Sequence, residues 1–183
     1  MIGLNPGMFV MPVAALLAIV SLSVFFSKIA VNKHAFKHFI GTVITIAFIL
    51  NYGWELSHCP LYSGCVYDGP HVAFLALASL ADTIMALLLY FGLALIYQQG
   101  LWIQGVTAFR IFWVMLIGGM GATISELAHL SAGNWSYTKD MPLIPGTAVG
   151  LSPVLQFTIL PILIYSLSRY RTTREATQSD SPT

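Results

Sequence analysis

Long, uncharged apolar stretches recur along the chain and are separated by short polar segments. Each stretch is close to the ~20 residues that an α-helix needs to cross the hydrocarbon core of a bilayer. The pattern therefore predicts an all-α integral membrane bundle of about five transmembrane helices, formed by a single domain over residues 1–168. The predicted spans are residues 8–27, 39–57, 71–97, 111–130 and 147–168. The polar residues 169–183 are predicted to form a disordered cytoplasmic tail.

The composition agrees with this pattern and excludes a soluble domain. Of the 183 residues, 57% are hydrophobic and only 8% are charged, whereas a soluble domain carries about 25% charged residues. The net charge is +1 and no basic patch is present, so nucleic acid is not an expected partner. Membrane lipids are the expected partners, and the composition leaves the oligomeric state open.

The distribution of basic residues predicts the orientation of the bundle. Seven of the eight Lys and Arg residues flank the predicted spans on one side, and only Lys139 lies on the other. The seven are Lys28, Lys33, Lys37, Arg110, Arg169, Arg171 and Arg174. Since positive residues stay in the cytoplasm, the N-terminus is predicted outside and the C-terminus inside. Residues 58–70 and 131–146 then face outward.

Three of the seven acidic residues lie within predicted spans: Glu55, Asp82 and Glu126. An ionisable group in hydrocarbon costs at least ~2.5–3.5 kcal/mol, so such groups face the bundle interior and mark functional sites. Asp82 is near the middle of its span, and the two glutamates are near the outer ends of theirs. These three are the candidate catalytic residues of an outward-facing cavity, with acid–base chemistry on a lipid or isoprenoid as the predicted activity.

Polar and aromatic residues at similar depth complete this predicted cavity. The candidate substrate-binding residues are Asn51, Trp54, Trp135, Tyr137 and Gln156, and His71 is placed at the rim. Asn51, Glu55 and His58 fall on one helical face. The sequence contains no nucleotide-binding loop, flavin fingerprint or Ser-His-Asp signature.

Two Glu-x-x-His turns offer a metal site as an alternative. Glu55 is followed by His58 and Glu126 by His129, each three residues apart. Paired Glu-x-x-His motifs with further carboxylates are the ligands of di-metal carboxylate bundles. The predicted ligands of a divalent metal are Glu55, His58, Asp82, Glu126 and His129. The second alternative is a non-catalytic binding or assembly protein, in which the acids only fix helix packing.

Both cysteines, Cys59 and Cys65, lie in the first outward segment. An oxidising exterior favours a disulfide between them. A Cys2His2 zinc site and two free thiols are the alternatives.

Two helix-packing features are also readable. Gly118, Gly119, Gly121 and Ala122 give the fourth span a small face that allows another backbone to approach closely. Pro153 and Pro161 are predicted to kink the fifth span, because each removes a backbone hydrogen bond.

Several stretches resemble a family of uncharacterised bacterial multi-pass membrane proteins. They are residues 51–62 (Asn-Tyr-Gly-Trp-Glu-Leu-Ser-His-Cys-Pro-Leu-Tyr), 80–82 (Leu-Ala-Asp), 125–126 (Ser-Glu), 134–142 (Asn-Trp-Ser-Tyr-Thr-Lys-Asp-Met-Pro) and 150–156 (Gly-Leu-Ser-Pro-Val-Leu-Gln). The resemblance implies a multi-pass protein of the bacterial inner (cytoplasmic) membrane and brings no established activity. Members of that family often carry Gln and Asn at the positions of His58 and His129, which favours the three carboxylates over the metal.

A shorter motif resembles integral-membrane terpene cyclases. The segment Asn-Tyr-Gly-Trp-Glu, residues 51–55, is similar to their Asn-x-x-Trp-Glu segment, in which the Glu helps to protonate an isoprenoid epoxide. The resemblance implies an acid role for Glu55 alone, and those cyclases have more spans than this chain.

Overall fold

A computed structural model describes residue 7 and residues 10–179. Five long helices make up most of it: α1 (Val10–Ile29), α2 (Lys33–His58), α3 (Gly69–Tyr97), α4 (Ala108–Ser131) and α5 (Leu151–Ser179). Two single-turn helices, η2 (Cys59–Leu61) and η3 (Trp102–Gly105), lie in the connections. The described residues form no β-strand, so the predicted all-helical fold is confirmed for this part of the chain.

All five helices are long and apolar enough to cross a membrane, which confirms the predicted number of candidate spans. Large apolar side chains stay exposed along their outer faces, for example Leu17 (66%), Ile49 (61%) and Ile124 (65%). Such faces suit contact with lipid chains and not with water.

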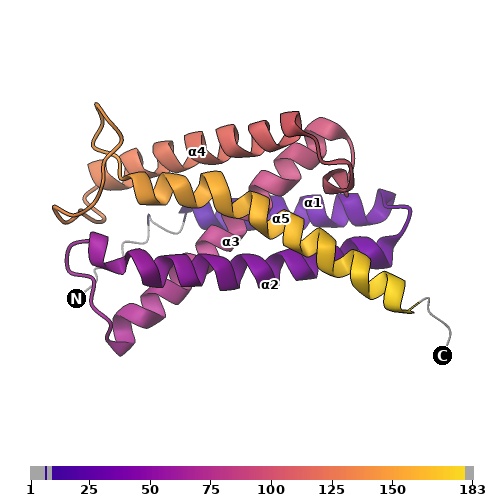
Figure 1. Cartoon of the computed structure of the whole chain (residues 1–183), viewed down its shortest axis with the longest axis horizontal. Helices are drawn as coiled ribbons and strands as arrows, with labels where there is room; N and C mark the ends of the chain where they lie inside the picture. Colours follow the sequence, from indigo (N-terminus) through magenta and orange to yellow (C-terminus); the bar gives the residue numbers. More distant parts are fainter. Residues whose placement is uncertain (1–6, 8–9, 180–183) are drawn as a thin grey trace.

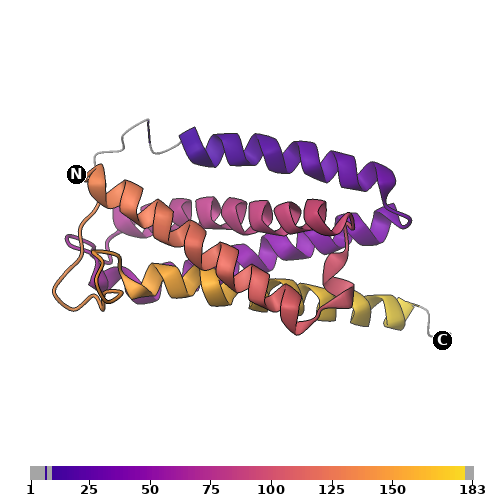
Figure 2. The same ribbon diagram turned by 90° about the horizontal axis from the view of Figure 1, so that it is seen from above.

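The helices run alternately up and down the long axis of the bundle (Figure 1). Helix α2 packs on both α3 and α5 in the centre, while α1 packs on α3 and α4 packs on α5. In the turned view, α1 lies along one edge of the bundle and α4 crosses diagonally in front of the other helices (Figure 2). The α2–α3 and α4–α5 connections lie at one end, and the start of α4 and the end of α5 lie at the other.

Polar side chains set where several helices begin. Asn32, Asp68 and Thr107 precede α2, α3 and α4 in extended backbone, and each side chain accepts a hydrogen bond from the N–H three residues on. These bonds satisfy N–H groups that have no partner within the helix. Helix α2 therefore begins at Lys33, before the predicted hydrocarbon span begins at residue 39.

Two statements about the fifth span need correction. Pro153 lies in the first turn of α5, where its missing N–H removes no intrahelical bond, so only Pro161 interrupts the helix interior. The segment predicted to be a disordered tail continues α5 as far as Ser179, and residues 180–183 lie outside the described part. Glu175 helps to hold this extension, since it pairs with His38 of α2 at 3.0 Å and with Arg171 at 3.3 Å.

An aromatic core fills the half of the bundle near the basic residues. Tyr90, Trp102 and Tyr165 are fully buried there and contact one another through their rings. Their polar atoms are satisfied by backbone: Tyr90 donates to the carbonyl of Gly100 at 2.7 Å and Tyr165 to that of Ala86 at 2.6 Å. This half is thus filled mainly by aromatic rings whose polar atoms bind backbone.

At the opposite end the two connections dock onto each other and form a loop layer, defined here as residues 59–68 and 132–150. Tyr62 and Tyr137 form an isolated antiparallel bridge. The Ser63 N–H donates to the carbonyl of Ser136 and the Thr138 N–H to that of Leu61, both at 2.9 Å. The loop layer covers the ends of α2 and α5 and is itself held by backbone hydrogen bonds.

Candidate functional site

The amide group of Gln156 is the centre of a buried polar cluster between α2, α3 and α5. Its Nε2 atom lies 2.9 Å from Asp82 Oδ2, 3.0 Å from Asn51 Oδ1 and 3.4 Å from Glu55 Oε1. Gln156 and Asn51 are each only 2% exposed. A primary amide has two hydrogen atoms to donate, so three oxygen acceptors compete for them. The structure thus brings together four of the residues that the sequence predicted for the site.

Neighbouring polar groups on α3 do not relieve this competition. Ser79 donates to the carbonyl of Leu75 at 2.7 Å, and Thr83 donates to that of Ser79 at 2.8 Å. Both hydroxyls are therefore directed back to their own helix. Asn51 likewise donates its Nδ2 to the carbonyl of Ala47 at 2.9 Å. Gln156 is consequently the donor that the structure gives to Asp82.

His58 continues the cluster toward the loop layer. Its Nε2 lies 3.1 Å from Glu55 Oε1, one helical turn back, and its Nδ1 lies 3.0 Å from Ser152 Oγ at the start of α5. The ring is 6% exposed, while Ser152 is partly exposed. The side chains of Glu55, His58 and Ser152 thus form a continuous hydrogen-bonded row. Ser152 was not among the predicted site residues.

Glu126, the third acid, is held from the loop layer. Its Oε2 accepts a hydrogen bond from the Tyr137 hydroxyl and another from Trp135 Nε1 at 3.2 Å. The Tyr137 oxygen in turn accepts the Gly150 N–H at 3.1 Å. Glu126 is 7% exposed, and its hydrogen-bond partners among the described residues are Tyr137 and Trp135 and not Gln156, so it forms a second polar group beside the first.

Tyr62 of the loop layer links the two groups. Its ring contacts those of His58, Trp135 and Tyr137. Burial, followed by the charges of Glu126 and Glu55 among others, raises the pKa of Tyr62 well above its ordinary value. Burial and the hydrogen bond to Glu126 raise the pKa of Tyr137 in the same direction. Both phenols therefore remain hydrogen-bond donors at neutral pH.

The five predicted metal ligands are not arranged as one ligand set. His129 stacks on the Trp135 ring with centroids 4.2 Å apart, and its Nδ1 lies 2.7 Å from Asn134 Nδ2. Its ring is thus engaged by the loop layer and not directed to the Gln156 cluster. Across residue 7 and residues 10–179, no group of three or more His, Cys, Asp or Glu residues has the arrangement to hold a metal ion. The donor geometry does not fit the predicted di-metal centre.

Three residues in or beside the α2–α3 connection, Cys59, Cys65 and His71, have local roles. Cys59 and Cys65 are joined by a disulfide, with Cα atoms 5.6 Å apart. His71, expected at the rim, binds Asp68 at the start of α3 through Nδ1 at 2.6 Å and through its backbone N–H at 2.9 Å. These hydrogen bonds from His71, the backbone one first, lower the pKa of Asp68.

One further indole group lies close to the cluster. Trp54 contacts the His58 ring edge-on, and its Nε1 is a buried donor without a hydrogen-bond partner. A buried N–H without a partner is costly and uncommon in a folded protein. Trp54 was predicted to bind substrate, and its free donor suits an acceptor atom of a ligand.

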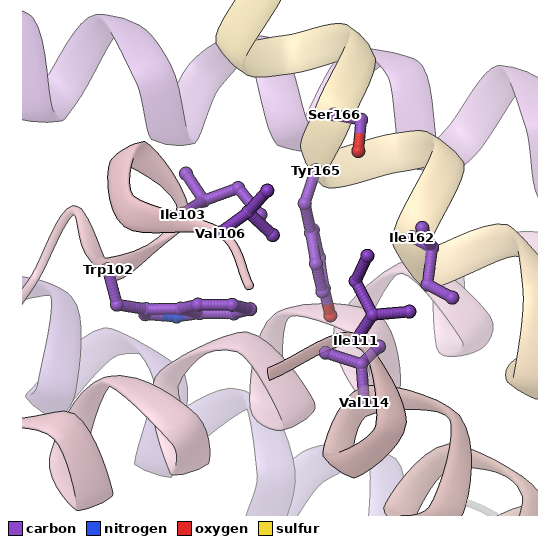
Figure 3. Close-up of a pocket in the computed structure, with 8 residues that line it drawn as sticks. All are labelled: Trp102, Ile103, Val106, Ile111, Val114, Ile162, Tyr165 and Ser166. Carbon is purple, nitrogen blue, oxygen red and sulfur yellow. The ribbon is translucent and has the colours of Figure 1, made fainter. Parts of the chain in front are cut away.

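Hollows elsewhere in the bundle carry no comparable chemistry. A cavity of about 10 Å³, lined by Trp102, Tyr165, Ser166 and five aliphatic residues, lies in the aromatic half and is about the size of one water molecule (Figure 3). An open apolar groove of about 410 Å³ runs between α4 and α5, beside Met115, Met120 and Val154. The polar groups around Gln156 and His58 are therefore the candidate site.

The fold and this site define a helical protein with five candidate membrane spans and a buried polar cluster at one end of the bundle. No family model, curated protein or solved structure matches the chain.

Proposed function

We propose that the chain is a multi-pass protein of a bacterial inner membrane that performs acid–base chemistry on a lipid or isoprenoid. The loop layer faces the exterior in this proposal, and the N-terminus is outside. The end of α1, the start of α2 and α4, and the end of α5 carry seven of the eight basic residues. Positive charge is retained in the cytoplasm, which supports this orientation.

The sharing of Gln156 Nε2 by Asp82 and Glu55 is the observation that carries the acid–base proposal. Two carboxylates close together in a medium of low dielectric cannot both be charged without a compensating cation. The pair then holds one exchangeable proton, which is the property required of a general acid. His58 binds Glu55 at 3.1 Å and gives that proton a route toward the loop layer.

The surroundings of the pair suit an apolar substrate with one polar end. Aromatic rings of Tyr62, Trp135 and Tyr137 lie on the exterior side of the pair, and Trp54 offers an unpartnered indole N–H. Rings bind apolar chains and stabilise developing positive charge. A lipid or isoprenoid reaches such a site from the bilayer, where its chain already resides.

The test compares Asp82→Asn with a matched loop variant, Asp140→Asn. Purified wild-type protein in liposomes is incubated with bacterial lipid and isoprenoid extracts, and the mixture is followed by mass spectrometry. We expect at least one species to be converted by the wild type and by Asp140→Asn. Conversion by Asp82→Asn should fall at least ~100-fold, because general acid–base catalysis contributes that much.

The thermal unfolding of both variants decides between catalysis and packing. Asn keeps the shape of Asp82 and its bond to Gln156, so the Asp82→Asn fold should remain. Lost conversion in a folded variant supports the proposal. Conversion that is equal in the wild type and in folded Asp82→Asn, or no conversion by the wild type, contradicts it.

A further inference from the structure

The row formed by Ser152, His58 and Glu55 has the arrangement of an activated nucleophile. Ser152 Oγ lies 3.0 Å from His58 Nδ1, and Glu55 Oε1 lies 3.1 Å from His58 Nε2. A hydroxyl, a base within hydrogen-bond reach and a third group that orients the base define nucleophilic catalysis in unrelated folds. We propose that Ser152 is a nucleophile that accepts an acyl group from a glycerolipid ester.

The hydrogen-bond polarity of the row fits this role. Glu55, as a carboxylate, accepts the proton on His58 Nε2, and this tautomer leaves Nδ1 as an acceptor for the Ser152 hydroxyl. His58 is 6% exposed, so the ring is shielded from water and held from both sides. Ser152 is partly exposed and is the member of the row that a substrate can reach.

The position of Ser152 also supplies a donor for the oxyanion. The first N–H groups of a helix have no intrahelical partner and carry partial positive charge. In the first turn of α5, the Leu151 N–H already donates to the carbonyl of Pro142 at 2.7 Å, and Pro153 has no N–H. Among Leu151, Ser152 and Pro153, only Ser152 therefore has a backbone N–H left to donate. This N–H belongs to the nucleophile itself, as in known oxyanion holes.

Depth in the membrane selects the substrate class. Ser152 is the second residue of α5, whose apolar segment begins at Leu151, so it lies at the edge of the hydrocarbon region. The ester groups of glycerolipids lie at this same boundary, between acyl chains and head groups. A soluble ester would have to cross the loop layer, whereas a glycerolipid presents its ester at this level.

The chemical step is balanced within the row and the lipid. Ser152 Oγ attacks the ester carbonyl carbon while its proton passes to His58 Nδ1, and the Ser152 N–H stabilises the oxyanion. The carbonyl re-forms, the bond to the glycerol oxygen breaks, and His58 returns the proton to that oxygen, which leaves as an alcohol. Water or another alcohol then attacks the acyl-Ser152 ester with the same proton transfers and regenerates the free hydroxyl.

This proposal goes beyond the acid–base function and shares only Glu55 and His58 with it. A fluorophosphonate probe tests it directly, since an activated serine displaces fluoride and becomes covalently labelled. The wild-type protein in micelles should be labelled, and peptide mass spectrometry should locate the label on Ser152. Ser152→Ala should not be labelled, while the exposed serine variant Ser57→Ala should label as the wild type does.

Two further variants separate an activated serine from an accessible one. His58→Gln and Glu55→Gln should label more slowly, the first by at least ~100-fold, with thermal unfolding measured to establish that each is folded. If folded His58→Gln is labelled at the wild-type rate, the proposal is overturned. It is also overturned if the wild-type protein is not labelled although it performs the conversion that depends on Asp82. If Ser152 is labelled in protein that shows no such conversion, the nucleophile proposal is supported and only the acid–base function is contradicted.

Discussion

Close contact between α4 and α5 leaves no room for a side chain at Gly118. A Cβ atom built on Gly118 would overlap the backbone carbonyl oxygen of Phe157 on α5. A backbone oxygen cannot rotate away, so Gly118→Ala must push the two helices apart. Gly121 lies one turn further along α4 and has no atom within 4 Å of its Cβ position. Gly121→Ala is therefore a matched control.

The difference in unfolding free energy between these two variants isolates the steric effect. Ala in place of Gly adds ~1 kcal/mol of helix propensity in both, and this gain cancels in the comparison. What remains is the cost of overpacking, about 1–3 kcal/mol. For a chain of this size that corresponds to a melting temperature lower by roughly 2–12 °C.

Thermal unfolding in detergent, followed by circular dichroism, measures this difference. The displacement should also reach the site, because Gln156 directly precedes Phe157 and is the donor to Asp82. Reduced conversion in Gly118→Ala, beside normal conversion in Gly121→Ala, is the expected accompanying result. If Gly118→Ala melts no lower than Gly121→Ala, the close approach of the helices is refuted.

Two further predictions concern the ends of the bundle. A reporter fused after Ser179 should indicate the cytoplasm, and one inserted at Gly146, a loop position with open space around it, should indicate the exterior; the opposite pattern contradicts the proposed orientation. Asp68 stabilises the start of α3, and its hydrogen bonds lower the pKa of its carboxyl group in the folded state. Its contribution to the free energy of unfolding should therefore be complete above pH 3.8, the ordinary pKa, and should be lost as the pH falls through the lower pKa of the folded state. Thermal unfolding should then show that Asp68→Ala is less stable than the wild type at pH 6 and that this difference is smaller at pH 3. The stability difference between Asp68→Asn and Asp68→Ala should not change in this way, because Asn caps the helix without titrating. A difference between Asp68→Ala and the wild type that is equal at both pH values contradicts this account.

The number and position of the helices could be predicted because hydrophobic length is a strong signal in membrane proteins. Helix ends were less accessible, since hydropathy reports the hydrocarbon-spanning part and not the whole helix. Capped by Asn32, α2 begins six residues before the predicted second span. Helix α5 continues to Ser179, past the end of the predicted fifth span. Pro153 was assigned a kink because the first residue of α5 was unknown.

Helical spacing placed Asn51, Glu55 and His58 on one face, but it could not show which helix faces them. Ser152 could have been predicted as a site residue, because it stands four residues before Gln156 and therefore shares its face of α5. The role of Tyr62 could not have been predicted, since its position depends on the docking of two loops that are far apart in sequence. His129 was misassigned for the same reason: the stacking of Trp135 on its ring follows from the loop layer.

The contribution of Gln156 from α5 gives the site an order of assembly. Helices α2 and α3 are synthesised before α5, so Asn51, Glu55 and Asp82 lack the Gln156 donor until α5 has been made. An unsatisfied polar group in hydrocarbon costs several kcal/mol, so a four-helix intermediate in a membrane is destabilised at this polar cluster. The arrival of α5 supplies the Gln156 donor and completes the packing against α2 and α4, so the polar cluster and the bundle are completed by the same step.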